Sequence, residues 1–493
     1  MTIPQPLFSF DNTYAREMDG FYVPWQGAAV PSPELVLLNE VLARDLGLDP
    51  AALKAADAAR IFTGTESPAG AAPLAQVYAG HQFGGFSPRL GDGRALLIGE
   101  VIDQAGQRRD IQLKGSGPTP FSRGGDGKAV IGPVLREYVI GEAMHALGIP
   151  TTRALAAATT GETIYRDGPK SGAVLTRVAS SHLRVGTFQY FAARGETDKV
   201  RQLADYAIER HDPDLASEAD KYILLLRCVI DRQAALIAEW LLVGFVHGVM
   251  NTDNTAISGE TIDYGPCAFL DAYDPEAVFS SIDHGGRYAF ARQPVLAQWN
   301  LARFAECLVP LIDPDDADRA VERATEELNR FAETYQDRWL AGMRAKLGLT
   351  TALDGDLALA GGLLDIMQAQ RADHTLVFRR LGEAARGNDD ALLTLFQTPD
   401  TPADWLRQWR DRLAKENADP GTTAKRMATV NPAYIPRNHT VEDALSAAEH
   451  GDYGPVHALL AAVTKPFDER DELAPYAQPA PADFGPYMTF CGT

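Results

Sequence analysis

The chain is poor in cysteine and in positive charge. Its 493 residues include only four cysteines, and no two of them form a Cys-x-x-Cys pair. This argues against a structural zinc site or a disulfide framework and fits a reducing cytosol. Lysines and arginines number 46 against 66 aspartates and glutamates, which gives a formal net charge of -20. A chain with this charge repels polyanions, so we expect no nucleic-acid partner.

Long apolar runs are also lacking. The most apolar stretch, residues 234–246, contains Glu239 and is shorter than the roughly 20 residues needed to cross a bilayer. Residues 1–16 lack the basic segment and apolar core of a secretory signal. Because the chain has neither feature, we expect a cytoplasmic protein without membrane partners. We also find no internal repeat.

The composition is that of a globular protein, and the chain is longer than one hydrophobic core can accommodate. Hydrophobic residues make up 45% and charged residues 23% of the chain, as in ordinary globular proteins. Single cores stop growing near roughly 250–300 residues. We predict four segments, which are an N-terminal extension (1–70), a strand-rich lobe (71–183), a helical lobe (184–345) and a C-terminal helical extension with a tail (346–493).

Local patterns predict the elements of these segments. Strand-like runs are 94–101, 110–114, 163–165 and 173–178, and the first two are joined by a hairpin turn that contains Gly106. Helical patterns cover about 133–147 and 217–245.

A further helix is predicted in the N-terminal extension. Ser32 can cap it, apolar residues recur at helical spacing from Leu35 to Leu42, and Gly47 marks its end.

Five features follow one another in an informative order. They are a Gly-rich turn (Gly91 to Gly93), a strand ending in Lys114, a helix carrying Glu137, a loop from His247 to Asn254, and the turn Asp263-Tyr264-Gly265. Protein kinases need these parts in this order, to cradle phosphates, neutralise them and hold divalent cations. No single piece is specific, but the joint order is rare by chance. It predicts an α+β, protein-kinase-like bilobal fold with a strand-rich N-lobe and a mostly helical C-lobe.

The loop departs from the kinase pattern at one position. His247 and Asn254 keep the seven-residue spacing of H-R-D-x-x-x-x-N, but Val249 occupies the place of the catalytic Asp. A valine cannot accept a proton, so ordinary phosphoryl transfer to a hydroxyl is in doubt. Asp253, beside Asn254, offers an acid in the same loop. We interpret His247 as a structural loop residue.

Cations are unusually frequent around these segments, at Arg94, Arg123, Lys128, Arg177 and Arg184. Arginine pairs with phosphate through two parallel hydrogen bonds. So many cations suggest that the phosphate tail is held rather than donated. A reversed nucleotide would turn its α-phosphorus toward the acceptor, which points to nucleotidyl transfer.

These segments also resemble a known family. The sequence resembles the selenoprotein O family of protein adenylyltransferases, also called SelO or YdiU. The resemblance is carried by GHQFGGFSPRLGDGRA (80–95), QLKGSGPTPFSRGGDGK (112–128), LREY (135–138), LTRVASSHLRVGTFQ (175–189), HGVMNTDN (247–254), DYGPC (263–267) and NPAYIPRNH (431–439). Together the motifs cover most of the chain and are highly specific.

The resemblance implies a pseudokinase-like fold that binds ATP in a flipped orientation. It implies transfer of AMP to Ser, Thr or Tyr hydroxyls of proteins, with Mg²⁺ or Mn²⁺ as cofactor. By motif position, Asp253 would accept the proton and Lys114 would pair with Glu137. The nucleotide would contact Gly91, Gly93, Arg94, Lys114, Asp126, Gly127, Arg177, Arg184 and Asp263, and the metal ligands would be Asn254 and Asp263.

Other interpretations stay open at this point. Glu142 lies on the same predicted helix as Glu137, Asp253 and Asp263 also suit turns, and the arginines also suit surface ion pairs. The alternative functions are a phosphotransferase whose base has moved to Asp253, a nucleotidyltransferase that uses UTP, and a nucleotide-binding regulator without catalysis. The sequence specifies neither the protein substrates nor the oligomeric state.

Two cysteines suggest a redox hypothesis. Some members of the family carry selenocysteine near the C-terminus, where this chain has Cys491 as its third-last residue. Cys267 follows the Asp263 turn closely. We hypothesise that the two form a reversible disulfide that pins this loop.

Overall fold

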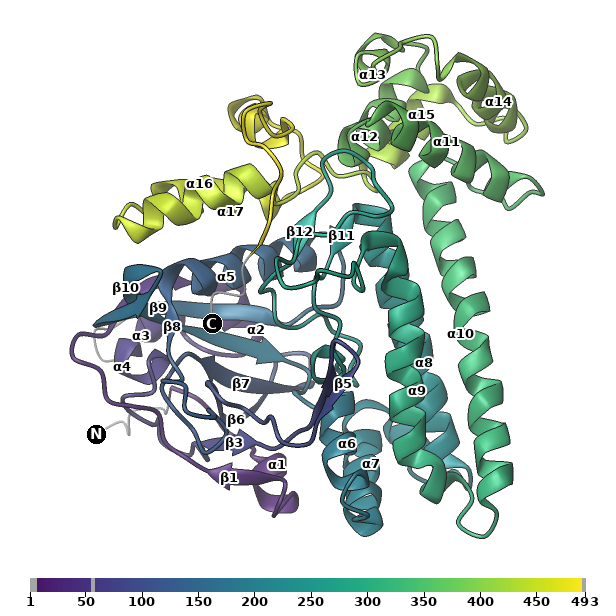
Figure 1. Cartoon of the computed structure of the whole chain (residues 1–493). Helices are drawn as coiled ribbons and strands as arrows, with labels where there is room; N and C mark the ends of the chain where they lie inside the picture. The colour runs from purple at the N-terminus through teal and green to yellow at the C-terminus, as the bar shows by residue number, and fades with distance from the viewer. Residues whose placement is uncertain (1–6, 55–57, 490–493) are drawn as a thin grey trace.

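The computed structural model describes residues 7–54 and 58–489 (Figure 1). The chain folds as a mixed α/β protein. Strands are concentrated in its first 180 residues, where they form an antiparallel sheet, and helices dominate the rest. Among the described residues, no helix is both long and apolar enough to cross a membrane.

One large antiparallel sheet organises the strand-rich half. Its order is β1-β3-β6-β7-β10-β9-β2, and the short β8 pairs with β10. The strands are β1 (Tyr22–Pro24), β2 (Glu34–Leu38), β3 (Leu74–Gln76), β4 (Gly80–Gln82), β5 (Gly85–Ser87), β6 (Ala95–Ile102), β7 (Arg108–Lys114), β8 (Ala129–Val130), β9 (Arg153–Arg166), β10 (Gly168–Ala179), β11 (Phe245–Val246) and β12 (Ala268–Phe269). The strand predicted at 94–101 is confirmed as β6, one residue further along, and those predicted at 110–114, 163–165 and 173–178 are confirmed within β7, β9 and β10.

The helices follow mostly after the sheet. They are α1 (Thr13–Glu17), α2 (Glu40–Asp45), α3 (Pro50–Leu53), α4 (Ala58–Phe62), α5 (Ile131–Ala146), α6 (Val185–Ala192), α7 (Thr197–His211), α8 (Lys221–Val243), α9 (Gln293–Ile312), α10 (Ala317–Lys346), α11 (Asp356–Gln370), α12 (His374–Ala384), α13 (Asp390–Leu393), α14 (Ala403–Ala414), α15 (Pro420–Ala428), α16 (Asn438–Glu449) and α17 (Gly454–Val463). Short 3₁₀ turns are η1 (Pro213–Leu215), η2 (Thr252–Asn254), η3 (Phe290–Arg292) and η4 (Asp471–Ala477). The helices predicted at 133–147 and 217–245 are confirmed as α5 and α8.

The helix predicted from residue 34 to residue 47 is wrong. Its first part is β2, which pairs with β9 so that Leu38 lies opposite Ala156. Asn39 then caps α2 by accepting a hydrogen bond from the Leu42 amide at 3.0 Å. The leucine spacing fits a strand followed by a short helix as well as one helix, and pairing with a distant strand decided the outcome.

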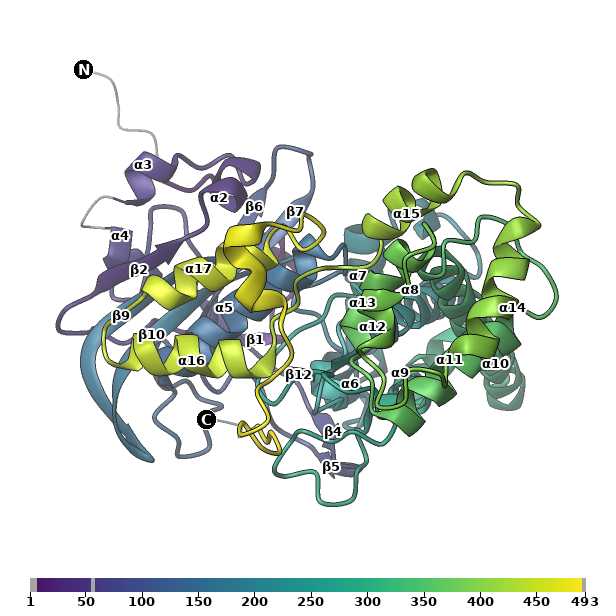
Figure 2. The same ribbon diagram turned by 90° about the horizontal axis from the view of Figure 1, so that it is seen from above.

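Helices cover both faces of the sheet. On one face α2 and α4 pack over β6, β7, β9 and β10, and on the other α5 packs against β9 and β10. Val441, Ala444, Leu445 and Ala448 of α16 recur at helical spacing and pack, with α17, on the same cluster as α5. Figures 1 and 2 show α5 between the sheet and the pair α16–α17, although α5 is far from these two helices in the sequence.

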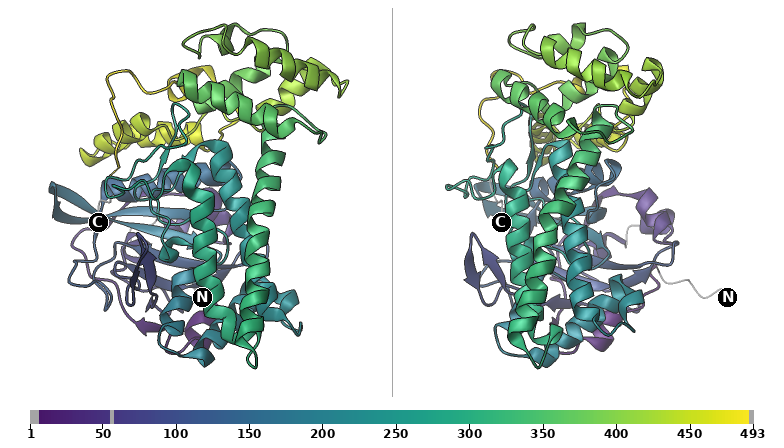
Figure 3. Two further views of the ribbon diagram at one scale, coloured as in Figure 1. Left: turned by 45° about the vertical axis from the view of Figure 1, so that its right-hand side comes forward. Right: turned by 90° about the vertical axis from the view of Figure 1, so that its right-hand side faces the viewer.

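The helical half has two cores. Helices α8, α9 and α10 run side by side in a long bundle (Figure 3), and their core is continuous with α6 and α7. Helices α11 to α15 share a separate core that contains Trp405 and Trp409. The loop that follows α8, residues 244–267, returns to the sheet and carries the polar residues described next.

Candidate active site

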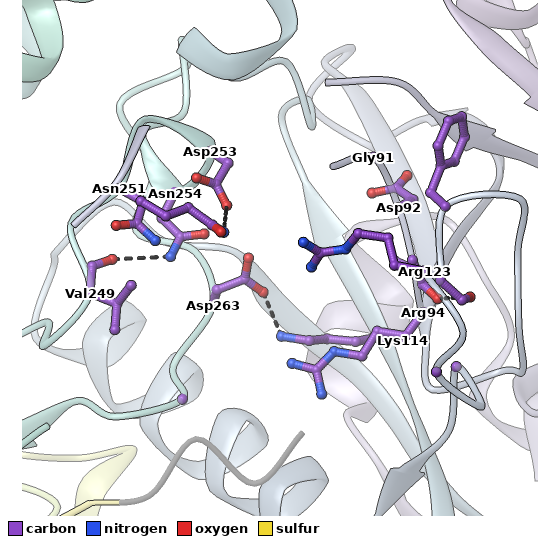
Figure 4. A pocket seen from close by; sticks show the side chains of 18 of the residues that line it. Gly91, Asp92, Arg94, Lys114, Arg123, Val249, Asn251, Asp253, Asn254 and Asp263 are labelled. Atoms are coloured by element: carbon purple, nitrogen blue, oxygen red, sulfur yellow. Dashed lines mark hydrogen bonds and ion pairs between the residues drawn. The ribbon is translucent and has the colours of Figure 1, made fainter. Parts of the chain in front are cut away.

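A cavity of about 510 Å³ opens between the sheet and the loop after α8. Figure 4 shows Arg94, Lys114 and Arg123 on one side, facing Asp253, Asn254 and Asp263 on the other. Val249 also lines the cavity. Of the residues predicted from the sequence, those that line it are Gly91, Gly93, Arg94, Lys114, Asp126, Gly127, Arg177, Arg184, Asp253, Asn254 and Asp263.

A compact ion network closes the inner end of the cavity. The Lys114 Nζ lies 2.7 Å from Glu137 Oε2 and 2.5 Å from Asp263 Oδ1. Arg177 donates to the same two carboxylates, from Nε to Glu137 Oε1 at 2.9 Å and from Nη2 to Asp263 Oδ1 at 2.5 Å. Arg184 Nη1 lies 3.3 Å from Asp263 Oδ2. One carboxylate, Asp263, is thus shared by three cations.

Glu137 rather than Glu142 contacts Lys114. Glu142, five residues further along α5, binds Arg153 at 2.7 Å and accepts a hydrogen bond from Asn39 at 2.7 Å. Glu137 lies behind Lys114, so it orients that lysine without lining the main cavity.

Asp263 is held as an anion in an unusual backbone conformation. Its φ of 64° is left-handed, which costs free energy for a residue other than glycine and occurs most often at functional sites. Burial favours its neutral form, but Lys114, Arg177 and Arg184 outweigh burial and hold the pKa of Asp263 well below its usual range. The same residue therefore carries a permanent charge and a strained geometry.

Asp253 has the opposite surroundings. Burial raises its pKa to about 6, although the nearby Arg184 opposes this shift. The Gln82 amide donates to Asp253 Oδ2 at 3.1 Å, whereas Oδ1 is buried and has no hydrogen-bond partner among the described residues. A β-carbon at position 80 would lie 2.4 Å from Oδ1, so Gly80 is required there. This carboxylate keeps one oxygen able to take a proton.

The remaining loop residues are held by the backbone. His247 is buried, and its Nε2 donates to the Ile262 carbonyl at 2.9 Å, which ties the loop to the segment before Asp263. It does not line the cavity, in keeping with a structural role. Asn254 donates from Nδ2 to the Val249 carbonyl at 3.0 Å, which fixes the orientation of its amide.

The oxygen groups here fit a small divalent cation. Within the described part of the chain, no group of three or more His, Cys, Asp or Glu residues forms a ready metal cage. Mg²⁺ is commonly held by one or two carboxylates together with substrate phosphates, rather than by a complete protein cage. The Asp263 carboxylate and the Asn254 amide, both on the cavity wall, match that requirement.

Positive charge is in excess around the cavity. Its acidic lining residues are Asp92, Asp126, Asp253 and Asp263, whereas its basic ones are Arg94, Lys114, Arg123, Lys128, Arg166, Arg177 and Arg184. Neither Arg94 nor Arg123 forms an ion pair within residues 7–54 and 58–489. This excess, in a chain of net charge -20, suits a polyanionic ligand.

The loop at residues 123–128 shapes the outer wall. Asp126 binds Arg166 through two hydrogen bonds of 2.9 Å. A β-carbon on Gly127 would lie 2.2 Å from the Gly117 carbonyl oxygen, so the loop closes on itself only with glycine there. Both residues face the cavity and also have these structural contacts.

Sequence reasoning missed several polar residues of the site, among them Asp92 and Gln82. Asp92 is buried, accepts a hydrogen bond from the backbone N–H of Gln76 at 3.1 Å and lies 3.9 Å from Arg184. Its position between Gly91 and Gly93 was the available signal. Gln82, which contacts Asp253, had no local signal, since its partner is 171 residues away.

Of the two cysteines in the redox hypothesis, only Cys267 lies among the residues that the structure describes. Cys267 is fully buried, and burial raises the pKa of its thiol to about 11. Cys491 lies outside the described residues. Thr489, near it in sequence, donates from Oγ1 to the Pro266 carbonyl at 2.8 Å.

Comparison with known proteins agrees with this geometry. The profile of the family described as "Protein adenylyltransferase SelO" matches residues 6–464. Proteins named "Protein nucleotidyltransferase YdiU" are similar over nearly the whole length. The one from Cereibacter sphaeroides is 61% identical over 488 residues, covering 99% of this chain and 100% of the relative. Those from Rhizobium rhizogenes and Bradyrhizobium sp. are each 57% identical, with 99% of this chain and 97% and 99% of the relatives covered. The chain therefore belongs to the SelO family of protein adenylyltransferases and is a nucleotidyltransferase.

Proposed function

We propose that this enzyme transfers AMP from ATP to serine, threonine or tyrosine hydroxyls of cytoplasmic proteins and releases pyrophosphate. The observation that carries the proposal is that one cavity holds both Asp253, with a buried oxygen that has no hydrogen-bond partner among the described residues, and a wall rich in cations. We further propose that the two halves of the chain correspond to the lobes of a protein kinase, with the nucleotide between them. The relatives' names support a protein acceptor.

The charge distribution supports a flipped nucleotide. Arg94 and Arg123, which lack ion pairs among the described residues, lie on the wall opposite Asp253. With the β- and γ-phosphates against these arginines and Lys114, the α-phosphorus faces Asp253. Val249, where kinases have their base, then needs no catalytic side chain.

The chemistry follows from this placement. Asp253 accepts the proton of the acceptor hydroxyl, whose oxygen forms a bond to the α-phosphorus. The bond between the α-phosphorus and the bridging oxygen to the β-phosphorus breaks, and pyrophosphate carries the electron pair away. Lys114, Arg94 and Arg123 stabilise its negative charge. Mg²⁺ or Mn²⁺, held by Asn254 and Asp263, would neutralise phosphate charge during this transfer.

A second candidate is transfer of UMP from UTP, because the relatives are named nucleotidyltransferases without a stated base. The same phosphate contacts serve either nucleotide. The base therefore has to be tested separately from the reaction.

We also propose that Cys267 and Cys491 form a reversible disulfide. The support is that Thr489 is hydrogen-bonded to the carbonyl of Pro266, the neighbour of Cys267. A thiol titration after mild oxidation should find two free thiols, and four would contradict the proposal.

The test of the main proposal uses labelled nucleotides. The purified protein is incubated with cell extract, Mg²⁺ or Mn²⁺, and ATP labelled at the α- or the γ-phosphate. We expect label in protein only from the α-position, and none with Asp263→Ala. Label only from the γ-position would show a kinase, and ATP binding without label would favour a regulator. A parallel reaction with α-labelled UTP decides the base.

A further inference from the structure

A small hairpin that is not part of the main sheet covers the catalytic loop. Among the described strands, β4 and β5 pair only with each other, and Figure 2 shows them at the edge of the molecule, below α6. Two consecutive residues of the hairpin form hydrogen bonds with two consecutive residues of the loop. The His81 amide donates to Thr252 Oγ1 at 2.6 Å, and Gln82 donates to Asp253.

The turn of this hairpin carries an exposed phenylalanine whose backbone has an unusual conformation. Phe83 and Gly84 form the two-residue turn between β4 and β5, and both have a left-handed φ, of 51° and 84°, as the tight turns of hairpins require. A phenylalanine is rare in this conformation. Its amide is held by Asn251 Oδ1 at 3.2 Å and by the Tyr288 hydroxyl at 3.1 Å. Asn251 and Tyr288 thus fix the backbone of Phe83, while 39% of the residue stays exposed.

A second exposed apolar residue lies at the same opening. Ile282 is 47% exposed and lines the cavity together with Phe83. Phe83 is tied to this side of the cavity by its contact with Asn251. Ile282 directly precedes Asp283, which accepts a hydrogen bond from the backbone amide of Tyr288, and the Tyr288 hydroxyl in turn contacts the Phe83 amide. Exposed apolar groups that border a polar site are typical of protein-contact surfaces, and aromatic anchors often supply most of their binding energy.

The opposite face of the hairpin provides a comparison. Phe86 is paired with His81, its ring lies 4.9 Å from the His81 ring, and 41% of the residue is exposed. Strand residues alternate between faces, and Phe86 does not line the cavity. The hairpin therefore carries two similarly exposed phenylalanines, only one of which is at the active site.

We propose that Phe83 and Ile282 form the acceptor-docking surface, which binds an apolar side chain next to the hydroxyl that receives the nucleotidyl group. This inference rests on the proposed function, because a protein acceptor must bring its hydroxyl to Asp253 past these two residues. The preferred acceptor is an exposed chain segment with a leucine, isoleucine or phenylalanine within a few residues of the modified serine, threonine or tyrosine.

The test compares the full-length protein with Phe83→Ser, Ile282→Ser and the control Phe86→Ser. The acceptors are synthetic nonapeptides with one central serine, threonine or tyrosine and with either leucine or lysine at the flanking positions. Incorporation of α-labelled ATP gives kcat and KM for each peptide, and ATP affinity is measured separately by calorimetry.

We expect the unaltered enzyme to favour the leucine peptides. Phe83→Ser should raise their KM about tenfold, as expected for an aromatic anchor, with ATP affinity unchanged, and Phe86→Ser should leave both values as they are. Equal KM values for Phe83→Ser and Phe86→Ser, or equal use of leucine and lysine peptides by the unaltered enzyme, would overturn the docking surface alone. An enzyme that binds ATP but labels no peptide and no protein would instead overturn the proposed function.

Discussion

The two ends of the cavity hold carboxylates of very different character. At the inner end Asp263 is shared by Lys114, Arg177 and Arg184, and its pKa lies well below the usual range. At the hairpin end Asp253 meets one amide donor, and burial raises its pKa to about 6. The two residues lie ten positions apart in one loop region. Environment rather than residue type therefore shifts the pKa values of these two aspartates in opposite directions.

The strongest test of this contrast removes each carboxylate in turn. Asp263→Ala leaves three buried cations without their shared partner and should lower the free energy of unfolding by about 3–5 kcal/mol, with loss of nucleotidyl transfer. Asp253→Ala removes a buried acid that has no cation partner of its own, so it should change stability by less than about 1 kcal/mol. Urea unfolding followed by circular dichroism measures both. Equal losses in the free energy of unfolding would show that the two carboxylates contribute equally to stability, against this contrast.

The second test concerns rate alone. Asp253→Asn keeps the size of the side chain but cannot accept the proton, so we expect kcat to fall about 10²–10⁴-fold. Affinity for ATP should stay within a factor of two or so, since the phosphates lie against the cations. Steady-state transfer of α-labelled AMP to protein measures kcat, and calorimetry measures affinity. A parallel loss of ATP affinity would place Asp253 among the nucleotide ligands instead.

The third test uses pH. Asp253 works as a base only when ionised, and its pKa of about 6 is raised from 3.8. The value of kcat/KM should be level above this pH and fall about tenfold per pH unit below it. Asp253→Asn serves as the control, because its residual activity should lack this limb. An acid limb that persists in the variant would have to come from another group.

The smallest effect should come from Gln82. Its amide stabilises the ionised form of Asp253 through the 3.1 Å hydrogen bond, so Gln82→Ala should move the acid limb of kcat/KM to higher pH. At pH 7 we expect a loss of about threefold to tenfold, as for one hydrogen bond to a charged group. The exposed Gln104→Ala is a matched control. An unshifted pH profile would mean that Gln82 does not tune the base.

The predicted site residues that line the cavity lie in short motifs, and most of them were assigned from the resemblance of those motifs to the SelO family. Lys114, Glu137, Asn254 and Asp263 each occupy the expected element, and the choice between Glu137 and Glu142 was settled by the contact with Lys114. Asp253 was singled out only because Val249 replaces the kinase base. Motif position was therefore informative but not sufficient, since Gln82 lies in the motif at residues 80–95 and was not singled out.

What could not be predicted depends on contacts between distant segments. The strand character of residues 34–38 comes from pairing with β9, more than a hundred residues later. The role of Gln82 depends on the hairpin folding over a loop 171 residues away. Likewise, Arg437 is fully buried between Asp271 and Asp373, at 2.6 and 2.8 Å. No single-sequence pattern encodes which distant carboxylate an arginine meets.

The packing of α16 and α17 on α5 links the C-terminal segment of the chain to the cavity. Helix α5 carries Glu137, and it is held on one face by the sheet and on the other by the chain's own C-terminal helices. Glu137 in turn contacts Lys114 on the cavity wall. The C-terminal helices thus support this lysine from behind, although neither of them lines the cavity.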